Sequence, residues 1–303
     1  MKEVGHTESL NKRYGPVDAL KNVTINLYEG LNLFLGPNGS GKSTLIKIMS
    51  GLIKPSNGEI ELMNLNPWQD RVKLMQKVGV QLENHALPKW AKGIEVLRYY
   101  AKLEKLSELD LKDGLNLFDI SSYVDRTIDG YSTGMYQRLV LTAALLGEPE
   151  MLILDEPTRG LDSVSQQKLY EKLTDKVKSG CTVILSTHLL AEMPLKADHA
   201  YFFMNGEVKK WGSMEKIAEE LGLIKLSFTI KDLNMARTLT KLRSIPEVKE
   251  VSLKGDTMEL LITSRGKVTD ELEKLGITQV TEEYDFVRIY SKALTQTPLN
   301  SQT

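Results

Sequence analysis

The sequence predicts an α/β fold with a central parallel sheet, an inserted helical subdomain and a small α+β domain at its C-terminal end. The run Met151–Leu154 is wholly apolar and Thr182–Leu185 reads as a second buried strand, which is typical of parallel strands that helices cover on both faces. Apolar residues spaced three and four apart predict that residues 85–146 are mostly helical. Beyond residue 214 strands and short helices follow one another in a different order. Together these observations predict two domains.

The change of pattern near residue 214 sets the expected domain boundary. We expect a first domain over residues 1–214, with its helical subdomain at about 84–146, and an accessory domain over 215–303. The accessory domain reads as strand, helix, strand, strand, helix, strand, an order that resembles a ferredoxin-like layer. Its expected strands cover residues 226–230, 248–253, 258–263 and 286–290, and its expected helices cover 234–242 and 269–275.

Composition narrows the class of protein without naming a function. The 303 residues carry 39 Lys and Arg against 40 Asp and Glu, so the net charge is −1. A nearly neutral chain has no overall field that would draw it onto nucleic acid, and we expect no nucleic-acid partner. No apolar run approaches the ~18–20 residues of a membrane span, and no apolar stretch follows the first charged residues as in a signal peptide. We therefore expect a cytoplasmic protein.

A glycine-rich loop lies between an expected strand, Leu31–Leu35, and an expected helix, Lys42–Gly51. It reads Gly-Pro-Asn-Gly-Ser-Gly-Lys-Ser-Thr and satisfies the phosphate-loop pattern in the context that this pattern requires. Glycines let backbone N–H groups turn toward phosphate, and the helix N-terminus adds the positive end of its dipole. Lys42 is expected to reach the β- and γ-phosphates of ATP, and Ser43 to offer a hydroxyl to Mg²⁺. The expected nucleotide-binding residues of this loop are Asn38, Gly39, Ser40, Gly41, Lys42, Ser43 and Thr44.

Two carboxylates, Asp155 and Glu156, follow the buried strand Met151–Leu154. The carboxyl edge of a parallel sheet is where ligands bind, so both side chains are expected near the phosphate loop. Asp155 is expected to hold Mg²⁺, and Glu156 to act as the general base toward water. By themselves the two residues would equally fit an acidic turn, but the phosphate loop favours the catalytic interpretation.

The segment Tyr131–Met135 reads Tyr-Ser-Thr-Gly-Met and precedes the acidic strand. It resembles the signature of the ATP-binding subunits of ABC transporters, usually Leu-Ser-Gly-Gly-Gln, with Thr133 and Met135 as departures. In that family the signature starts a helix whose N-terminus faces the γ-phosphate held by a second subunit. The resemblance implies this role for Ser132 and Gly134, and it implies a P-loop RecA-like ATPase core over residues 1–214.

Three further residues match elements of the same family in order along the chain. Tyr14 resembles the aromatic residue that stacks on adenine; otherwise it is a surface aromatic. Asp162, in Gly-Leu-Asp, resembles the turn that crosses the dimer interface; otherwise it caps the following helix. His188 follows the strand ending at Thr187 and resembles the switch histidine that contacts the γ-phosphate.

One element of the family leaves two candidates. A glutamine usually follows the strand that precedes the helical subdomain, where it senses Mg²⁺ or the attacking water. Alignment on Gly79 places Glu83 at this position, and Gln81 then falls within the strand. We name both residues, prefer Glu83 as a metal-site residue and interpret Gln81 as a strand residue.

The resemblance implies an ATPase motor with ATP and Mg²⁺ as cofactors. It further implies a head-to-tail dimer with a second ATP-binding subunit and a separate integral-membrane subunit, at the inner face of the membrane. The signature variant and the C-terminal layout favour an exporter over an importer. The alternative is a soluble ABC ATPase that is not coupled to transport. A P-loop kinase would not need the signature, and a regulatory subunit without turnover would not need Glu156 and His188.

Overall fold

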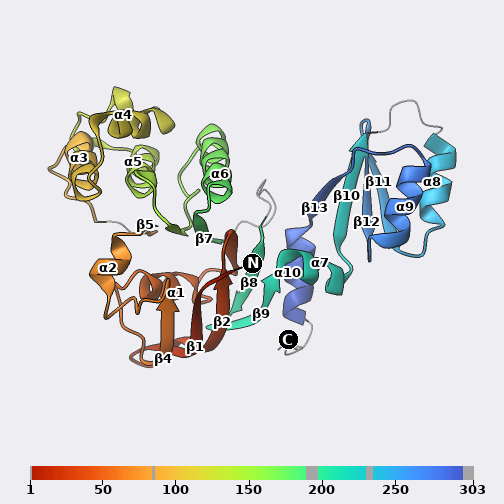
Figure 1. Ribbon diagram of the computed structural model, residues 1–303, viewed down its shortest axis with the longest axis horizontal. Coiled ribbons are helices and arrows are strands. Elements are labelled where there is room, and N and C mark those ends of the chain that lie inside the picture. The colour runs from red at the N-terminus through yellow and green to blue at the C-terminus, as the bar shows by residue number, and fades with distance from the viewer. Residues whose placement is uncertain (1, 84–85, 189–196, 230–234, 296–303) are drawn as a thin grey trace. The chain divides into compact units, whose positions relative to one another are not determined.

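The computed structural model describes residues 2–83, 86–188, 197–229 and 235–295 (Figure 1). The chain divides into two compact units. Residues up to 188 together with 197–209 belong to the first unit, and the chain from residue 210 onward belongs to the second. The division falls within a strand, whereas the sequence prediction placed it after residue 214.

A six-stranded sheet with the order β5-β6-β7-β3-β8-β9 forms the centre of the first unit. The neighbours from β5 to β8 are all parallel. Their carboxyl ends therefore meet at one edge, where the register pairs Asp155 with Ser186 and Gln81 with Leu154. The strands are Leu31–Leu35 (β3), Val78–Gln81 (β5), Met151–Asp155 (β6), Thr182–Thr187 (β7), His199–Met204 (β8) and Glu207–Ser213 (β9).

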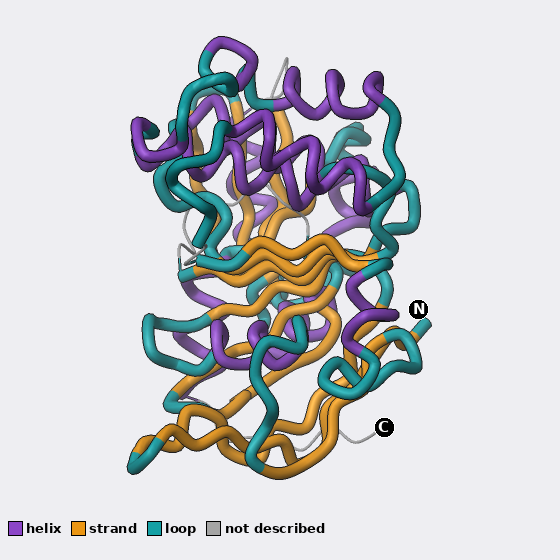
Figure 2. The backbone as a smooth tube through the Cα atoms, turned by 90° about the vertical axis from the view of Figure 1, so that its left-hand side faces the viewer, coloured by secondary structure: helices purple, strands orange, loops and turns teal. Residues whose placement is uncertain are grey.

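Helices cover both faces of this sheet, as the apolar strands required. Every residue of β3, β6 and β7 is buried. Helices α5 (Thr133–Leu145) and α6 (Ser163–Lys178) lie on one face, and α1 (Lys42–Met49) lies on the other (Figures 1 and 2). The α/β parallel-sheet prediction is confirmed.

A three-stranded antiparallel sheet with the order β2-β1-β4 lies beyond α1 (Figure 1). It contains β1 (Glu3–Tyr14), β2 (Val17–Tyr28) and β4 (Asn57–Leu62). The sequence analysis did not predict β1, which ends at Tyr14. Only three residues of β1 are fully buried, and Ser9 has a positive φ of 45° where the register shifts, so no regular alternation marks this strand.

The expected helical segment is present. It contains α3 (Gly93–Leu103), α4 (Glu108–Leu117) and α5, and α2 (Arg71–Met75) precedes it. Ser107 caps α4: its hydroxyl accepts from the Asp110 N–H at 3.2 Å, while the Asp110 carboxylate accepts from the Ser107 N–H at 2.8 Å. Two short 3₁₀ turns, Ile120–Ser122 and Ile128–Gly130, connect α4 to α5.

The second unit contains the expected strand–helix–strand–strand–helix–strand order around an antiparallel sheet, β11-β12-β10-β13. This is the ferredoxin-like arrangement that the sequence predicted. Its strands are Ile224–Thr229 (β10), Val248–Lys254 (β11), Thr257–Ile262 (β12) and Thr281–Tyr284 (β13), and its helices are Met214–Leu221 (α7), Met235–Arg243 (α8), Gly266–Lys274 (α9) and Phe286–Thr295 (α10).

The prediction of a final strand at 286–290 was wrong, because these residues begin α10. Phe286, Ile289 and Ala293 are spaced three and four apart and form one buried helical face. The Asp285 carboxylate accepts from the Arg288 N–H at 3.0 Å, which satisfies a backbone donor of the first turn.

In the part of the chain that the structure describes, no helix has the length and apolar character needed to cross a membrane.

The packing of α5 on β5 gives a test of this fold. A Cβ atom on Gly79 would lie 2.2 Å from the Ala144 carbonyl oxygen, whereas one on Gly130 meets nothing within 4 Å. We expect Gly79→Ala to lower the free energy of unfolding by roughly 1–3 kcal/mol because backbone must move to accommodate it. Urea unfolding measures the change, and Gly130→Ala is the control. Equal midpoints for both variants would contradict the described packing.

Candidate active site

The phosphate loop connects β3 to α1 and has a backbone that favours glycine at two positions. Gly39 and Gly41 have φ values of 78° and 111°. A Cβ on Gly41 would also lie 2.8 Å from the Ala19 carbonyl oxygen. The loop is stabilised by a hydrogen bond from the Ser40 N–H to the Pro37 carbonyl, at 3.2 Å. The expected loop residues, from Asn38 to Thr44, thus lie at the N-terminus of α1.

Lys42 is folded against its own loop. Its ammonium group donates to the Gly36 carbonyl at 2.7 Å and to the Pro37 carbonyl at 3.2 Å. Burial lowers the pKa of Lys42, and the nearby Glu156 and Asp155 carboxylates oppose that shift. The loop therefore presents a desolvated cation beside two acidic groups.

Asp155 ends β6 and contacts residues from two other elements. Its Oδ1 accepts from the Ser186 hydroxyl at 2.6 Å and from the Ser43 hydroxyl at 3.1 Å. Its Oδ2 is buried without a hydrogen-bond partner among the described residues. A buried carboxylate oxygen with no donor, beside a serine hydroxyl, fits a hard divalent cation such as Mg²⁺. Ser43 and Asp155, two of the three residues that the sequence assigned to Mg²⁺, are thus in contact although 112 positions separate them in the chain.

Glu156 lies between Lys42 and His188. One carboxylate oxygen is 3.7 Å from the Lys42 ammonium, and the other is 2.8 Å from Nδ1 of His188. Its backbone has a φ of 50°, an uncommon value for a residue with a side chain. Its N–H donates to the Ser186 hydroxyl at 3.0 Å and the Ser186 carbonyl at 3.2 Å. The strained turn after β6 therefore directs Glu156 to the loop lysine.

The signature segment begins α5 and lies against the loop that follows Glu156. Ser132 caps the helix, its hydroxyl accepting from the Met135 N–H at 3.3 Å. A Cβ on Gly134 would lie 3.0 Å from the Gly160 carbonyl oxygen, so the two backbones approach closely. The Gln137 amide donates to the Pro157 carbonyl at 2.9 Å.

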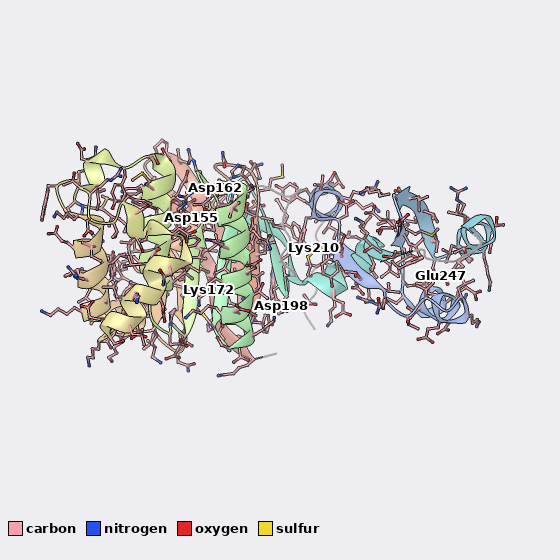
Figure 3. All side chains as sticks on the ribbon, turned by 90° about the horizontal axis from the view of Figure 1, so that it is seen from above. Asp155, Asp162, Lys172, Asp198, Lys210 and Glu247 are labelled. Carbon is pink, nitrogen blue, oxygen red and sulfur yellow. The ribbon has the colours of Figure 1, made fainter. Side chains whose placement is uncertain are left out.

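Asp162 caps α6 and also pairs with the signature helix. It accepts from the Ser165 N–H at 2.8 Å, a bond that lowers its pKa, and its carboxylate forms an ion pair with Arg138. Figure 3 labels Asp155 and Asp162 at the two ends of the connection between β6 and α6. Asp162 thus caps α6, and its expected place at a dimer interface stays a prediction.

Two predicted residues lie apart from these contacts. Tyr14 is 45% exposed, and the Lys12 ammonium lies 5.1 Å from its ring centre. The Glu83 carboxylate pairs with Arg159, in the loop between Glu156 and Asp162. Contact with Arg159 does not test the metal role expected of Glu83, which stays a prediction.

The sequence analysis missed Ser186, and it named Gln81 only as the less favoured alternative to Glu83. Gln81 is the last residue of β5 and Ser186 the penultimate residue of β7, the two strands that flank β6, and both are completely buried. The available signal in the sequence was a polar residue at or next to the end of each buried strand. Only the order of the strands in the sheet, however, places these two residues beside Asp155.

Comparison with known proteins agrees with this geometry. The ABC transporter family matches residues 20–159. The lantibiotic transport ATP-binding protein SrtF of Streptococcus pyogenes is 32% identical over 70% of this chain and 93% of its own length. The chain belongs to the ATP-binding subunits of ABC transporters. This ABC subunit is an ATPase, and along its chain the phosphate loop is followed by the signature and then by the acidic strand.

Two further relatives of this ABC subunit extend into the second unit. The daunorubicin resistance ATP-binding protein DrrA3 of Streptomyces coeruleorubidus is 29% identical over 91% of the chain and 87% of its own. A solved ATP-binding subunit of an ABC transporter has a TM-score of 0.66 and 26% identity, and covers 80% of this chain and 100% of its own.

The contact between Lys42 and Glu156 predicts how the ABC subunit binds ATP. If the γ-phosphate binds Lys42 as the sequence predicts, it displaces the Glu156 carboxylate, and Glu156→Gln is then expected to bind ATP roughly three- to tenfold more tightly, which corresponds to about 1 kcal/mol. Titration of a fluorescent ATP analogue without Mg²⁺ measures the affinity. Glu150→Gln, at an exposed glutamate that pairs with Lys77, is the control. Unchanged or weaker binding by Glu156→Gln would show that the two anions do not compete.

Proposed function

We propose that this ABC subunit is the ATP-hydrolysing motor of an exporter, acting as a dimer on a separate integral-membrane subunit. It would work in the cytoplasm, bound to the inner face of the membrane. The observation that carries the proposal is the assembly of Lys42, Asp155 and Glu156 at one sheet edge. The transport and drug-resistance names of SrtF and DrrA3 support export over a soluble ABC ATPase.

Each residue has a separate task in hydrolysis. Lys42 binds the γ-phosphate, and release of Glu156 from Lys42 leaves its carboxylate facing the phosphate. Glu156 then takes the proton of the attacking water, while His188, 2.8 Å away, orients the carboxylate. When Mg²⁺ is bound, it neutralises charge on the phosphates, and Ser43 and Asp155 would hold it. Glu83 would join them after separating from Arg159.

A second subunit completes the site. Ser132 and the first N–H groups of α5 form a helix N-terminus suited to a phosphate, and we propose that this phosphate belongs to ATP on the partner. Gln137 and Arg138 tie this helix to the 157–162 loop of the same chain. Closure of a head-to-tail dimer on ATP would move the helical subdomain and this loop together.

The base role of Glu156 predicts a stalled dimer. Glu156→Gln keeps the shape of the side chain but removes its basic oxygen, so turnover is expected to fall roughly 10²–10⁴-fold. With ATP and Mg²⁺ the variant is expected to elute as a stable dimer in size-exclusion chromatography. Glu150→Gln is expected to hydrolyse ATP at the wild-type rate. Wild-type turnover by Glu156→Gln would refute the base assignment.

A groove beside the helical subdomain is the proposed seat of the membrane subunit. It has a volume of about 630 Å³ and lies between α2 and β5 on one side and α3 and α5 on the other. Its lining is mainly apolar and includes Leu52, Leu82, Leu87, Tyr100, Leu103 and Val140. Trp90, three residues from Leu87, is 81% exposed, which favours a partner over internal packing.

Removal of Trp90 tests this surface. Trp90→Ala is expected to lower recovery of the subunit with native membranes by about tenfold, because an exposed aromatic anchor is lost. Its unfolding midpoint and its ATPase rate in solution are expected to stay at wild-type values. Trp68→Ala, at an exposed tryptophan outside the helical subdomain, is the control. Wild-type membrane recovery by Trp90→Ala would exclude this residue from the docking surface.

A further inference from the structure

Gln81 is a buried amide at the end of a strand. It is completely buried and pairs with Leu154 in the parallel register of β5 and β6. A buried amide is unfavourable unless its polar groups find partners, and an apolar residue would fill the same position without that penalty. The contacts of the amide therefore indicate what the residue does.

In the described part of the chain, only the donor end of this amide has hydrogen-bond partners. Its Nε2 donates to the Leu82 carbonyl at 3.0 Å and to the Asp155 carbonyl at 3.1 Å. Because both partners are acceptors, the NH₂ group must face them. The Oε1 atom is buried without a hydrogen-bond partner among the described residues. What Gln81 contributes to the structure is therefore a pair of hydrogen bonds that hold two backbone carbonyl groups in place.

The Asp155 carbonyl belongs to the peptide that joins the two acidic residues. The N–H of the same peptide, contributed by Glu156, donates to Oγ and to the carbonyl oxygen of Ser186. Gln81 comes from β5 and Ser186 from β7, the two neighbours of β6. The peptide is therefore held on both of its polar groups, from both sides of the strand.

This peptide precedes the strained φ of 50° at Glu156. Rotation of the peptide would change that torsion and would displace the Glu156 carboxylate from Lys42 and His188. We propose that Gln81 is a positioning residue for hydrolysis, which acts with Ser186 by fixing the Asp155–Glu156 peptide. The inference rests on the proposed role of Glu156 as the base.

The variant Gln81→Met tests the inference, because it keeps the volume of the side chain and removes the donor. We expect kcat to fall roughly tenfold to hundredfold and KM for ATP to stay within about twofold, since a small displacement of a catalytic group affects chemistry more than binding. Thr142→Val, which removes a buried hydroxyl that has no hydrogen-bond partner among the described residues, is the matched control and is expected to keep both constants. An unchanged kcat in Gln81→Met would overturn the inference.

A second arm separates positioning from general packing. In the Glu156→Gln background, Gln81→Met is expected to slow residual single-turnover hydrolysis by less than about twofold, since residues that act as a unit are not additive. If Gln81→Met slowed hydrolysis as strongly in the Glu156→Gln background as it does in the wild-type enzyme, the inference would be overturned. A Glu156→Gln enzyme with wild-type turnover would instead refute the proposed base, and so the two failures are distinguishable.

Ser186 provides the same test should Gln81→Met not fold. Ser186→Ala removes the hydroxyl that holds the Glu156 N–H, and Ser186→Thr keeps a hydroxyl at the same position. We expect the alanine variant to lose kcat with KM retained and the threonine variant to recover most of the loss. Equal rates for the two variants would overturn the inference.

Discussion

The register of β6 between β5 and β7 is the constraint on which the site depends. It places the last residue of β6, Asp155, beside Ser186 and brings Gln81 to the same edge. Because all these strands are parallel, the phosphate loop after β3 opens at this edge as well. A shift of one residue in β6 would remove both carboxylates from the loop. The buried apolar side chains of β6 fix its register, and the register in turn fixes where the two carboxylates lie.

The two carboxylates serve different partners although they are adjacent in sequence. Asp155 contacts hydroxyl groups and retains one buried oxygen that has no donor among the described residues, whereas Glu156 contacts Lys42 and His188. The Lys42–Glu156 pair neutralises two buried charges, and loss of either partner would leave the other uncompensated. In the proposed mechanism, the γ-phosphate of ATP replaces the Glu156 carboxylate at Lys42. Nucleotide binding and release of the proposed base would thus be coupled by a single charge pair.

Sequence predicted the parts of the site that are local in the chain. The phosphate loop and the pair Asp155 and Glu156 each follow one strand directly, so periodicity and glycine spacing were enough. Gln81, Ser186 and the Glu83–Arg159 pair depend on which strands and loops are neighbours, and strand order is not contained in local patterns. The helix at Phe286 was mistaken for a strand because its first turn carries aromatic and β-branched residues. The unit that contains it still has the predicted order of strands and helices.

In the proposed mechanism, the signature of one subunit completes the ATP site of another. Lys42→Ala and Ser132→Arg are each expected to abolish ATPase activity, because every site of either homodimer has one defect. Mixed in equal amounts, they would form heterodimers with one intact site, and about a quarter of the wild-type rate is expected from random pairing. Recovery of activity on mixing is the predicted result. A mixture as inactive as its components would contradict the account, since it would place Ser132 in the site of its own chain.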